Sequence, residues 1–303
     1  MKAVVLTGFG GVDKLEFKDV DNPKAGAGEV LVRMRATSVN PVDWKIRSGA
    51  SRGRIDVELP AILGRDLAGE VEHVGDGVSG FKKGQRVMAL ANHTYAELAT
   101  AKAEVLTPIP DGLSFEAAAA LPLVSLTGTQ LVERAVKIQS GQTVLITGAL
   151  GGVGRSAVHA ALKHGAKVIA GVRKQQVEEA RRLGAQQVVA IDDEQEIGKL
   201  HDLDAVADTV GGKTATQLLK TLKKGGVFGS VLGAPAGADQ YDVRVEAFMA
   251  QPDAARLAEL AKDAASGDFA IPIAKAMPLK QAGEAQSEAE QGRVHGKIVL
   301  KIA

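Results

Sequence analysis

The first third of the chain carries the pattern of short β-strands. From Val4 to Ala103, apolar or alternating runs such as Glu29–Arg35 and Glu70–Val74 are separated by glycine-containing turn clusters. Near Ser114 the pattern changes to helix-favouring residues with a run of alanines. We therefore predict an antiparallel β-rich domain, a partly open barrel, followed by the start of a helix-rich region.

The middle of the chain alternates between two periodicities. Apolar runs rich in Val and Ile predict strands at Thr143–Thr147, Lys167–Val172, Gln187–Ile191, Ala205–Val210 and Gly226–Leu232. Between them, helices are predicted at Val153–His164, Gln176–Leu183, Glu194–Lys199 and Lys213–Leu222. Strands that are apolar throughout and alternate with helices indicate a parallel sheet covered on both faces, which is the doubly wound α/β architecture.

The chain beyond Tyr241 does not continue this alternation. Its predicted elements are a strand at Asp242–Ala247, a helix at Pro252–Ser266, a strand at Ile273–Leu279, a polar helix at Lys280–Gln291 and a strand at Lys297–Ile302. We return the last of these segments to the β-rich domain. The predicted domains are therefore residues 1–118 with 251–303, and an inserted α/β domain of residues 119–250.

Composition narrows the class of protein. The 303 residues are 45% hydrophobic and 24% charged, which is typical of a soluble protein of two domains. No run reaches the roughly 20 apolar residues that span a bilayer, and Met1–Gly8 reads as a strand and turn rather than a signal peptide, so we expect a cytoplasmic protein. The formal net charge of +1, with basic residues scattered among acidic ones, argues against a nucleic-acid partner.

The chain contains no cysteine, which excludes disulfides, a thiolate nucleophile and every zinc site with cysteine ligands. The six histidines show no spacing that is typical of a metal site. We predict that the protein binds no metal.

A glycine-rich turn carries the strongest chemical signal. It consists of Gly148, Ala149, Leu150, Gly151, Gly152, Val153 and Gly154, and it joins a predicted strand to a predicted helix. Glycines in this setting permit a tight turn and let backbone N–H groups approach a pyrophosphate at the positive end of the helix. An ordinary glycine turn is the alternative, but the strand–turn–helix context favours a dinucleotide site.

The residues after the second strand indicate which dinucleotide binds. An enzyme specific for NAD usually has an acidic residue here to bind the ribose 2′-hydroxyl, whereas this chain has Arg173 and Lys174. Both cations can bind a 2′-phosphate, Arg through paired hydrogen bonds and Lys as a point charge. We predict NADPH as the cofactor; the alternative is that both side chains are simply solvated at the start of a helix.

Several ordered motifs are familiar. They are Ser38–Gly49, Leu63–Val71, Phe81–Val87, Gly148–Gly154 and Gly292–Val299. On these segments the chain resembles, over its whole length, the zinc-independent quinone oxidoreductase branch of the medium-chain dehydrogenase/reductase superfamily. The resemblance implies a GroES-like β-barrel domain interrupted by a Rossmann domain, with a cleft between them for the nicotinamide, and a homodimer.

The resemblance also bears on metal binding. Zinc-dependent relatives have a cysteine in the segment where this chain has Asn40–Asp43, and a Gly-His-Glu motif where it has Gly64, Arg65 and Asp66. Both zinc ligands are replaced, so the resemblance, like the composition, implies a metal-free site.

The resemblance further implies roles for individual residues. It puts Asn40 near the nicotinamide ribose, Thr127 near the nicotinamide and phosphates, the backbone of Leu232, Gly233 and Ala234 against the carboxamide, and the loop with Gly296 and Lys297 at the cofactor. For Lys297 the alternative is a charge on an edge strand. The chain departs from its relatives at Lys45, where they often have tyrosine, and at Gln176, where they have a lysine for the 2′-phosphate; Arg173 can supply that charge.

Without metal or thiol, the chemistry best served is hydride transfer from NADPH to an acceptor that needs little activation, such as a quinone or an α,β-unsaturated carbonyl. Lys45 can polarise a carbonyl or relay a proton, unless it is merely exposed. Trp44, Tyr95 and Phe248 are candidates for lining the substrate cleft, with core packing as the alternative for each. A metal-free alcohol dehydrogenase and a non-catalytic NADPH-binding regulatory protein are the competing functions.

Overall fold

The computed structural model describes residues 1–292 and 294–303, and it divides into two compact units. Unit 1 contains Met1–Leu123 and Pro252–Ala303, and unit 2 contains Val124–Gln251. The first division falls inside helix α3 (Pro122–Gln130), whereas the predicted boundary at residue 118 lies before that helix. Residue 293, within the recognised segment Gly292–Val299, lies outside the described residues.

Unit 2, every residue of which the structure describes, contains a six-stranded sheet with the order β11-β10-β9-β12-β13-β14, and all of its strand pairs are parallel. The strands are β9 (Thr143–Thr147), β10 (Lys167–Val172), β11 (Gln187–Ala190), β12 (Leu203–Asp208), β13 (Leu222–Ser230) and β14 (Arg244–Ala247). The prediction of a doubly wound parallel sheet is confirmed.

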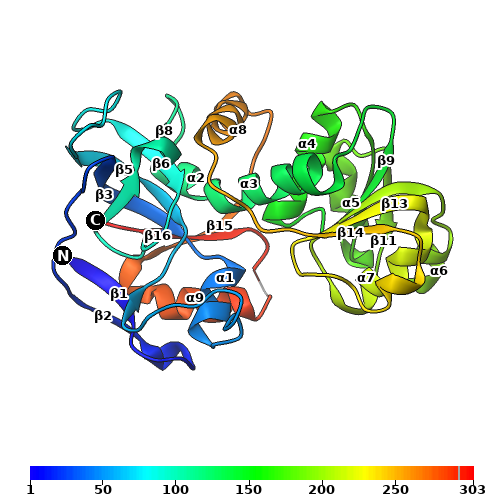
Figure 1. The fold of residues 1–303 in the computed structure, drawn as a ribbon, viewed down its shortest axis with the longest axis horizontal. Coiled ribbons are helices and arrows are strands. Elements are labelled where there is room, and N and C mark those ends of the chain that lie inside the picture. Colours follow the sequence, from blue (N-terminus) through cyan, green and yellow to red (C-terminus); the bar gives the residue numbers. More distant parts are fainter. Residues whose placement is uncertain (293) are drawn as a thin grey trace. The chain divides into compact units, whose positions relative to one another are not determined.

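Both faces of this sheet are buried, which explains why its strands are apolar throughout. Val144 and Ile146 of β9 face α4 (Gly152–Lys163) and α5 (Val177–Ala180), and Leu145 between them faces the opposite layer, α6 (Glu194–Gly198) and α7 (Gly212–Leu218). Figure 1 shows helices on either side of these strands. The period of two along each strand sends alternate side chains to two separate cores.

The prediction that the strand–helix alternation ends before Asp242 is wrong. β14 pairs in parallel with β13 from Val227↔Arg244 to Ser230↔Ala247 and so completes the sheet. It forms the edge of the sheet, and both Arg244 and Ala247 are exposed. An edge strand of this kind lacks the continuous apolar run by which the inner strands are recognised.

Unit 1 is built mainly from antiparallel strands. In its described part, one sheet has the order β15-β16-β3-β5-β6-β8, with β7 also paired to β3, and a smaller sheet has the order β2-β1-β4. Its strands are β1 (Lys2–Leu6), β2 (Leu15–Asp19), β3 (Glu29–Ser38), β4 (Ala61–Ile62), β5 (Asp66–Val74), β6 (Arg86–Leu90), β7 (Leu98–Lys102), β8 (Thr107–Pro108), β15 (Ile273–Pro278) and β16 (Lys297–Lys301). Its helices are α1 (Pro41–Arg47), α2 (Phe115–Ala119), α8 (Ala254–Ser266) and α9 (Ala282–Glu290).

The end of the chain returns to the middle of unit 1. β16 pairs antiparallel with β3 from Val299↔Ser38 to Lys301↔Ala36. Helices α1 and α9, which are far apart in the sequence, lie side by side (Figure 1). One hydrophobic core contains Met34 and Leu67 from the first segment and Leu300 from the second. The two segments of unit 1 therefore form a single folded body.

Gly128 provides a test of helix packing in unit 2. A Cβ at this position would lie 2.2 Å from the Val153 carbonyl oxygen and 2.7 Å from the Ala157 amide nitrogen, both of which belong to the backbone of α4. Although alanine favours helix over glycine, we expect Gly128→Ala to destabilise the protein by about 1–3 kcal/mol, because two helix backbones must separate.

Gly198→Ala in α6 is the matched control, since a Cβ there meets nothing within 4 Å. Urea unfolding should show no loss of stability for the control. Equal stability of the two variants would show that the close approach of α3 to α4 is wrong.

Candidate functional site

The glycine turn of unit 2 is shaped by close backbone contacts. Gly148 has a φ of +61°, and a Cβ at Gly154 would lie 2.1 Å from the Gly148 carbonyl oxygen. α4 starts directly after Gly151, which has no side chain to cap the helix, and its first turn contains no acidic residue. The turn thus presents a helix N-terminus with uncapped N–H groups to an incoming anion, and a pyrophosphate fits it.

A buried carboxylate supports this turn, and the sequence patterns did not identify it. Asp208, at the end of β12, accepts hydrogen bonds from Thr147 Oγ1 at 2.9 Å and Ser230 Oγ at 2.8 Å, and from the N–H groups of Val210 and Gly211. These donors come from β9 and β13, the two strands that flank β12, and from the loop that follows β12. Asp208 therefore holds the carboxyl edge of the sheet together beside the glycine turn. The sequence did contain a signal for this residue, because Asp208 is an acidic residue at the end of an apolar strand and shortly before two glycines.

The two cations that follow β10 differ in their surroundings. Arg173 and Lys174 are both exposed, and Lys174 Nζ lies 3.4 Å from Asp193 Oδ2. Arg173 has no ion-pair partner among the residues that the structure describes. Its guanidinium is therefore available to a ligand at the end of β10.

The other residues predicted to contact the cofactor from unit 2 lie on three elements. Thr127 is buried in α3 beside Gly128, whose contacts bring it to the start of α4. Leu232 is exposed in the loop after β13, where Gly233 has a φ of +107° and Ala234 is exposed. Phe248 is partly buried against the core of unit 2, and its N–H donates to the Ser230 carbonyl oxygen.

Unit 1 contains a buried ion pair. Lys297 Nζ lies 3.6 Å from Asp66 Oδ2, and the two side chains are 7% and 0% exposed. The ammonium also donates to the Val39 carbonyl oxygen at 2.9 Å and to Asn40 Oδ1 at 2.6 Å. Burial lowers the pKa of Lys297, and Asp66 is the main charge that opposes this shift. Lys297 begins β16 but lies in the interior of unit 1, so it is not an exposed edge-strand charge.

Asp66 uses both carboxylate oxygens. Oδ2 accepts hydrogen bonds from Ser38 Oγ and from Asn40 Nδ2, the latter at 2.6 Å, and Oδ1 accepts the N–H of Leu123 at 2.7 Å. Asn40 is thus held at both ends of its amide, by Asp66 and by Lys297. Both oxygens of this buried carboxylate are therefore hydrogen-bonded, as burial of a charged group requires.

A second buried carboxyl group lies beside this pair. Asp43 Oδ2 accepts hydrogen bonds from the Tyr95 hydroxyl and from the Asn40 N–H, both at 2.8 Å. The pKa of Asp43 is raised to about 6, mainly by burial; the Asp66 charge acts in the same direction, and the Asn40 and Tyr95 hydrogen bonds and Lys297 act in the opposite direction. Burial and the Asp43 charge also raise the pKa of Tyr95. Asp43 therefore titrates closer to neutrality than an ordinary aspartate.

The structure brings Asn40, Tyr95 and Lys297 together in unit 1, but not the other residues predicted there. Tyr95 is fully buried, with its hydroxyl on Asp43. Trp44 is partly buried and packs against the core, which was the alternative to lining the substrate cleft. Lys45 is exposed on α1. Gly296 has a φ of +126°, and a Cβ there would lie 2.7 Å from the Pro272 carbonyl oxygen.

Asp43 also borders a cavity of about 530 Å³. Its walls are mainly apolar, and polar groups line one part of it. The residues are Asp43, Ile46, Ile55, Asp56, Val57, Glu58, Pro60, Ala61, Ile62, Leu63, Gly64, Arg65, Asn92 and His93. All of them belong to unit 1, and the volume is within the range of small-molecule sites.

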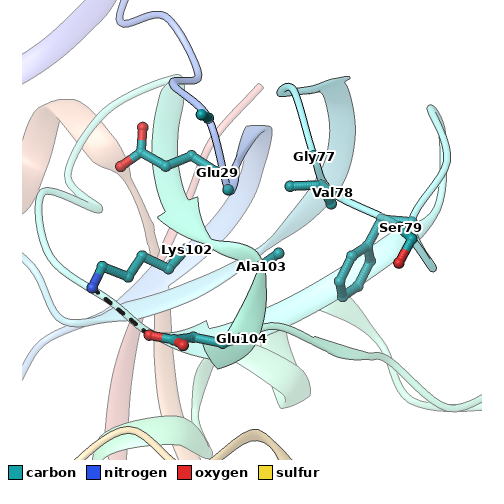
Figure 2. A pocket seen from close by; sticks show the side chains of 10 residues that line it. Glu29, Gly77, Val78, Ser79, Lys102, Ala103 and Glu104 are labelled. Atoms are coloured by element: carbon teal, nitrogen blue, oxygen red, sulfur yellow. Dashed lines mark ion pairs between the residues drawn. The ribbon is translucent and has the colours of Figure 1, made fainter.

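Another cavity, of about 590 Å³, lies elsewhere in unit 1 (Figure 2). Figure 2 shows Lys102 paired with Glu104 at its side. Lys102 Nζ lies 3.7 Å from Glu104 Oε1, and both side chains are largely exposed. Glu29, which also lines it, accepts the Gly26 N–H. The charged side chains of this cavity are exposed to solvent or already paired. It is therefore a weaker candidate for a catalytic or binding site than the cavity beside Asp43.

The described residues contain neither a metal-binding cluster nor a membrane-spanning helix. No group of three or more His, Asp or Glu side chains is placed to hold a metal ion. No helix in the same residues is long and apolar enough to cross a bilayer.

Known proteins resemble both units. Residues 26–111 match the alcohol dehydrogenase GroES-like domain, and residues 183–300 match the zinc-binding dehydrogenase family. The quinone oxidoreductase of Rattus norvegicus is 34% identical over 239 residues, which cover 75% of this chain and 71% of that protein. The chain belongs to the medium-chain dehydrogenase/reductase superfamily.

Solved structures agree with this membership. The quinone oxidoreductase from Coxiella burnetii is 30% identical with a TM-score of 0.90, covering 100% of this chain and 99% of its own. An NAD-dependent alcohol dehydrogenase is 27% identical with a TM-score of 0.89, covering 100% of both chains. The predicted membership in the quinone oxidoreductase branch is confirmed. As a member of this superfamily, the protein is an oxidoreductase with a nicotinamide cofactor, and its two units are the GroES-like and Rossmann domains.

The buried ion pair of this dehydrogenase/reductase can be tested by removing one charge. We expect Lys297→Met to destabilise the protein by about 3–5 kcal/mol, because Asp66 then stays buried without a counter-ion. Adding Asp66→Asn should recover part of the loss, which a double-mutant cycle of urea unfolding measures. Lys301→Met, an exposed lysine on the same strand, is the control. Additive effects of the two substitutions would rule out the pair.

Asp43 should make stability depend on pH in an unusual direction. Its pKa is raised in the folded protein, so protonation stabilises the fold, and this contribution is complete below the ordinary value of 3.8 and lost as pH rises through about 6. We expect the unfolding free energy of the wild type to fall relative to Asp43→Asn by about 3 kcal/mol across this range.

Asp19→Asn is the control for this titration, because the pKa of exposed Asp19 is lowered by Lys2 and its difference from wild type should not fall over the same range. Urea unfolding at a series of pH values measures both differences. A constant difference for Asp43→Asn would contradict the raised pKa.

Proposed function

We propose that this protein is an NADPH-dependent, metal-free reductase that transfers hydride to a quinone or an α,β-unsaturated carbonyl. The observation that carries NADPH is Arg173, an exposed guanidinium at the end of β10 that forms no ion pair with any described residue, at the position where an NAD enzyme usually has an acid. The quinone acceptor rests on the similarity to quinone oxidoreductases over most or all of the chain.

The cofactor would be held mainly by unit 2. In the proposal, the turn Gly148–Gly154 binds the pyrophosphate, Arg173 and Lys174 bind the 2′-phosphate, and the backbone of Leu232–Ala234 binds the carboxamide, with Thr127 nearby. The reduced nicotinamide supplies a hydride when bound. The uncapped start of α4 supports this assignment. The close glycine packing supports it too, since a side chain at Gly154 would clash with the Gly148 carbonyl oxygen and distort the turn.

The absence of a metal rests on the residues themselves. The chain has no cysteine, and Asn40 and Arg65 stand in the segments that ligate zinc in zinc-dependent relatives. Beside them the Lys297 ammonium already lies between Asn40 and Asp66, so a positive charge occupies this part of unit 1. A second cation there would be repelled. An acceptor that is electrophilic without a Lewis acid suits such a site.

The proposed roles of several unit 1 residues rest on the family resemblance. Asn40 is proposed to contact the nicotinamide ribose, although its side chain is already bonded to Asp66 and Lys297. Lys45 stays a candidate for polarising the acceptor, and Trp44 for lining its site. The tyrosine hydroxyl of Tyr95 acts on Asp43 instead, which argues against direct substrate contact.

The alternative of a metal-free alcohol dehydrogenase is favoured by the similarity to an NAD-dependent alcohol dehydrogenase. An unactivated alcohol needs a base or Lewis acid, and an NAD enzyme needs an acidic residue after the second strand, where Arg173 stands. Oxidation of NADPH and of NADH against a panel of quinones, enones and aldehydes distinguishes the two. NADPH binding without turnover of any acceptor would indicate a regulatory protein.

Arg173→Asp tests the proposed cofactor. We expect the KM for NADPH to rise severalfold or more while the KM for NADH changes little, because the carboxylate repels the 2′-phosphate and can bind the 2′-hydroxyl. Arg182→Asp, another exposed arginine of unit 2, controls for net charge. Steady-state kinetics with both cofactors measure the preference. An unchanged ratio of the two KM values would exclude Arg173 from the cofactor site.

A further inference from the structure

Two residues that line the cavity beside Asp43 each have a buried polar side-chain atom without a hydrogen-bond partner among the described residues. Asp43 Oδ2 is bonded to Tyr95 and to the Asn40 N–H, whereas the buried Oδ1 has no partner. The buried Nε of Arg65, which lines the same cavity, also has none. Buried polar groups are normally satisfied, so an unused acceptor and an unused donor on one cavity indicate a ligand that carries oxygen.

The rest of the cavity selects the shape of that ligand. Ile46, Ile55, Val57, Ile62 and Leu63 form apolar walls suited to a ring. Exposed Asp56 and Glu58 lie at the solvent side, and they disfavour an anionic ligand. An uncharged ring with a carbonyl or hydroxyl oxygen fits these walls and the two unused groups. Quinones and their quinols are in this class.

Resting on the proposed function, we propose that this cavity binds the oxygen-bearing ring of the acceptor and that Asp43 is the acid that protonates it during reduction. Arg65 Nε–H donates a hydrogen bond to an oxygen of the ring in both redox states. The protonated carboxyl of Asp43 donates to the quinone oxygen, and the ionised carboxylate accepts from the quinol hydroxyl.

The reaction balances with one acid. The quinone accepts a hydride, with its electron pair, from the reduced nicotinamide and a proton from the Asp43 carboxyl, and a quinol, the oxidised nicotinamide and the Asp43 carboxylate result. Solvent then returns a proton to Asp43 through the side of the cavity where Asp56 and Glu58 are exposed. No further oxidant or reductant is needed.

The surroundings of Asp43 suit an acid that works near neutrality. Burial raises its pKa to about 6, within the range in which a general acid is effective at physiological pH. The charged and titratable groups around Asp43 come from several elements. Asp66 lies on β5, Lys297 on β16 and Arg47 on α1, the helix of Asp43 itself. The others are Tyr95 and the cavity residues Asp56, Glu58, Arg65 and His93. Tyr95 donates to the ionised carboxylate and therefore keeps this pKa from rising further.

The kinetic test follows kcat/KM for menadione against pH. For the wild type we expect the value to fall about tenfold per pH unit above about pH 6, because only the protonated acid is active. Asp43→Asn keeps an amide oxygen that can accept from Tyr95 and Asn40 but cannot donate the proton. It should be at least about tenfold slower at low pH and should lose the break.

Tyr95→Phe distinguishes an acid from a merely structural residue. Loss of the hydroxyl removes a donor that lowers the Asp43 pKa, so the break should move to higher pH while turnover persists. Lys301→Met, at an exposed lysine that does not line the cavity, is the control and should leave the break in place. A break that survives in Asp43→Asn, or one that Tyr95→Phe does not move, overturns the proposal.

A binding experiment without cofactor tests the cavity independently of turnover. Isothermal titration calorimetry measures how tightly a ligand binds to the cavity. Above pH 6 we expect para-hydroxyacetophenone to bind about tenfold more tightly than para-methoxyacetophenone, because only the phenol donates to the carboxylate. Asp43→Asn should abolish this preference, and Arg65→Met should weaken both ligands alike.

The outcomes separate this inference from the proposed function. Failure of the wild type to reduce any quinone or enone would reject the proposed function, and the phenol preference would still show whether the cavity binds its ligand through Asp43. Turnover with an unaltered pH profile in Asp43→Asn, or equal binding of the two acetophenones, would reject the inference alone.

Discussion

The buried pair of Asp66 and Lys297 is the interaction on which unit 1 depends. Two charges in an apolar interior are tolerated only when they are paired and fully hydrogen-bonded, and here they are, through Ser38, Asn40 and the backbone of Val39 and Leu123. Their strands, β5 and β16, come from opposite ends of the chain and lie on either side of β3. The pair therefore specifies how the C-terminal segment returns to the first one.

The same charges shape the chemistry of the site. The Lys297 ammonium contributes a positive charge between Asn40 and Asp66. Asp66 raises the pKa of Asp43 and Lys297 lowers it. Burial is the larger effect, so the pKa of Asp43 is raised toward neutral pH. In unit 2 the buried carboxylate Asp208 has only neutral hydrogen-bond donors around it. These are hydroxyl and N–H groups at the edge of the sheet, and their hydrogen bonds fix the loops around the glycine turn.

Much of this could be predicted from the sequence because the signals are local. The strand–helix alternation, the glycine turn and the cations after β10 each depend on neighbouring residues, and the two-sided burial of the sheet follows from its apolar strands. The exposed edge strand β14 was predicted as a strand but not as part of the parallel sheet, because packing on both faces, not pairing, produces the apolar pattern of the inner strands. The polar cluster of unit 1 depends on a contact between residues 40 and 297, which no periodicity reveals. Asp43 and Asp66 did carry a signal, since each is an acidic residue within a segment that otherwise reads as apolar or helix-capping.

The central claim is that the cluster around Asp66 and Lys297 leaves Asp43 as a carboxyl group that gains and loses a proton near neutrality. The most direct measurement is the carboxyl ¹³C chemical shift of Asp43 in the cofactor-free protein, with Asp43→Asn used to assign the resonance. We expect a titration midpoint at about pH 6. A midpoint at the ordinary value of 3.8 would contradict it.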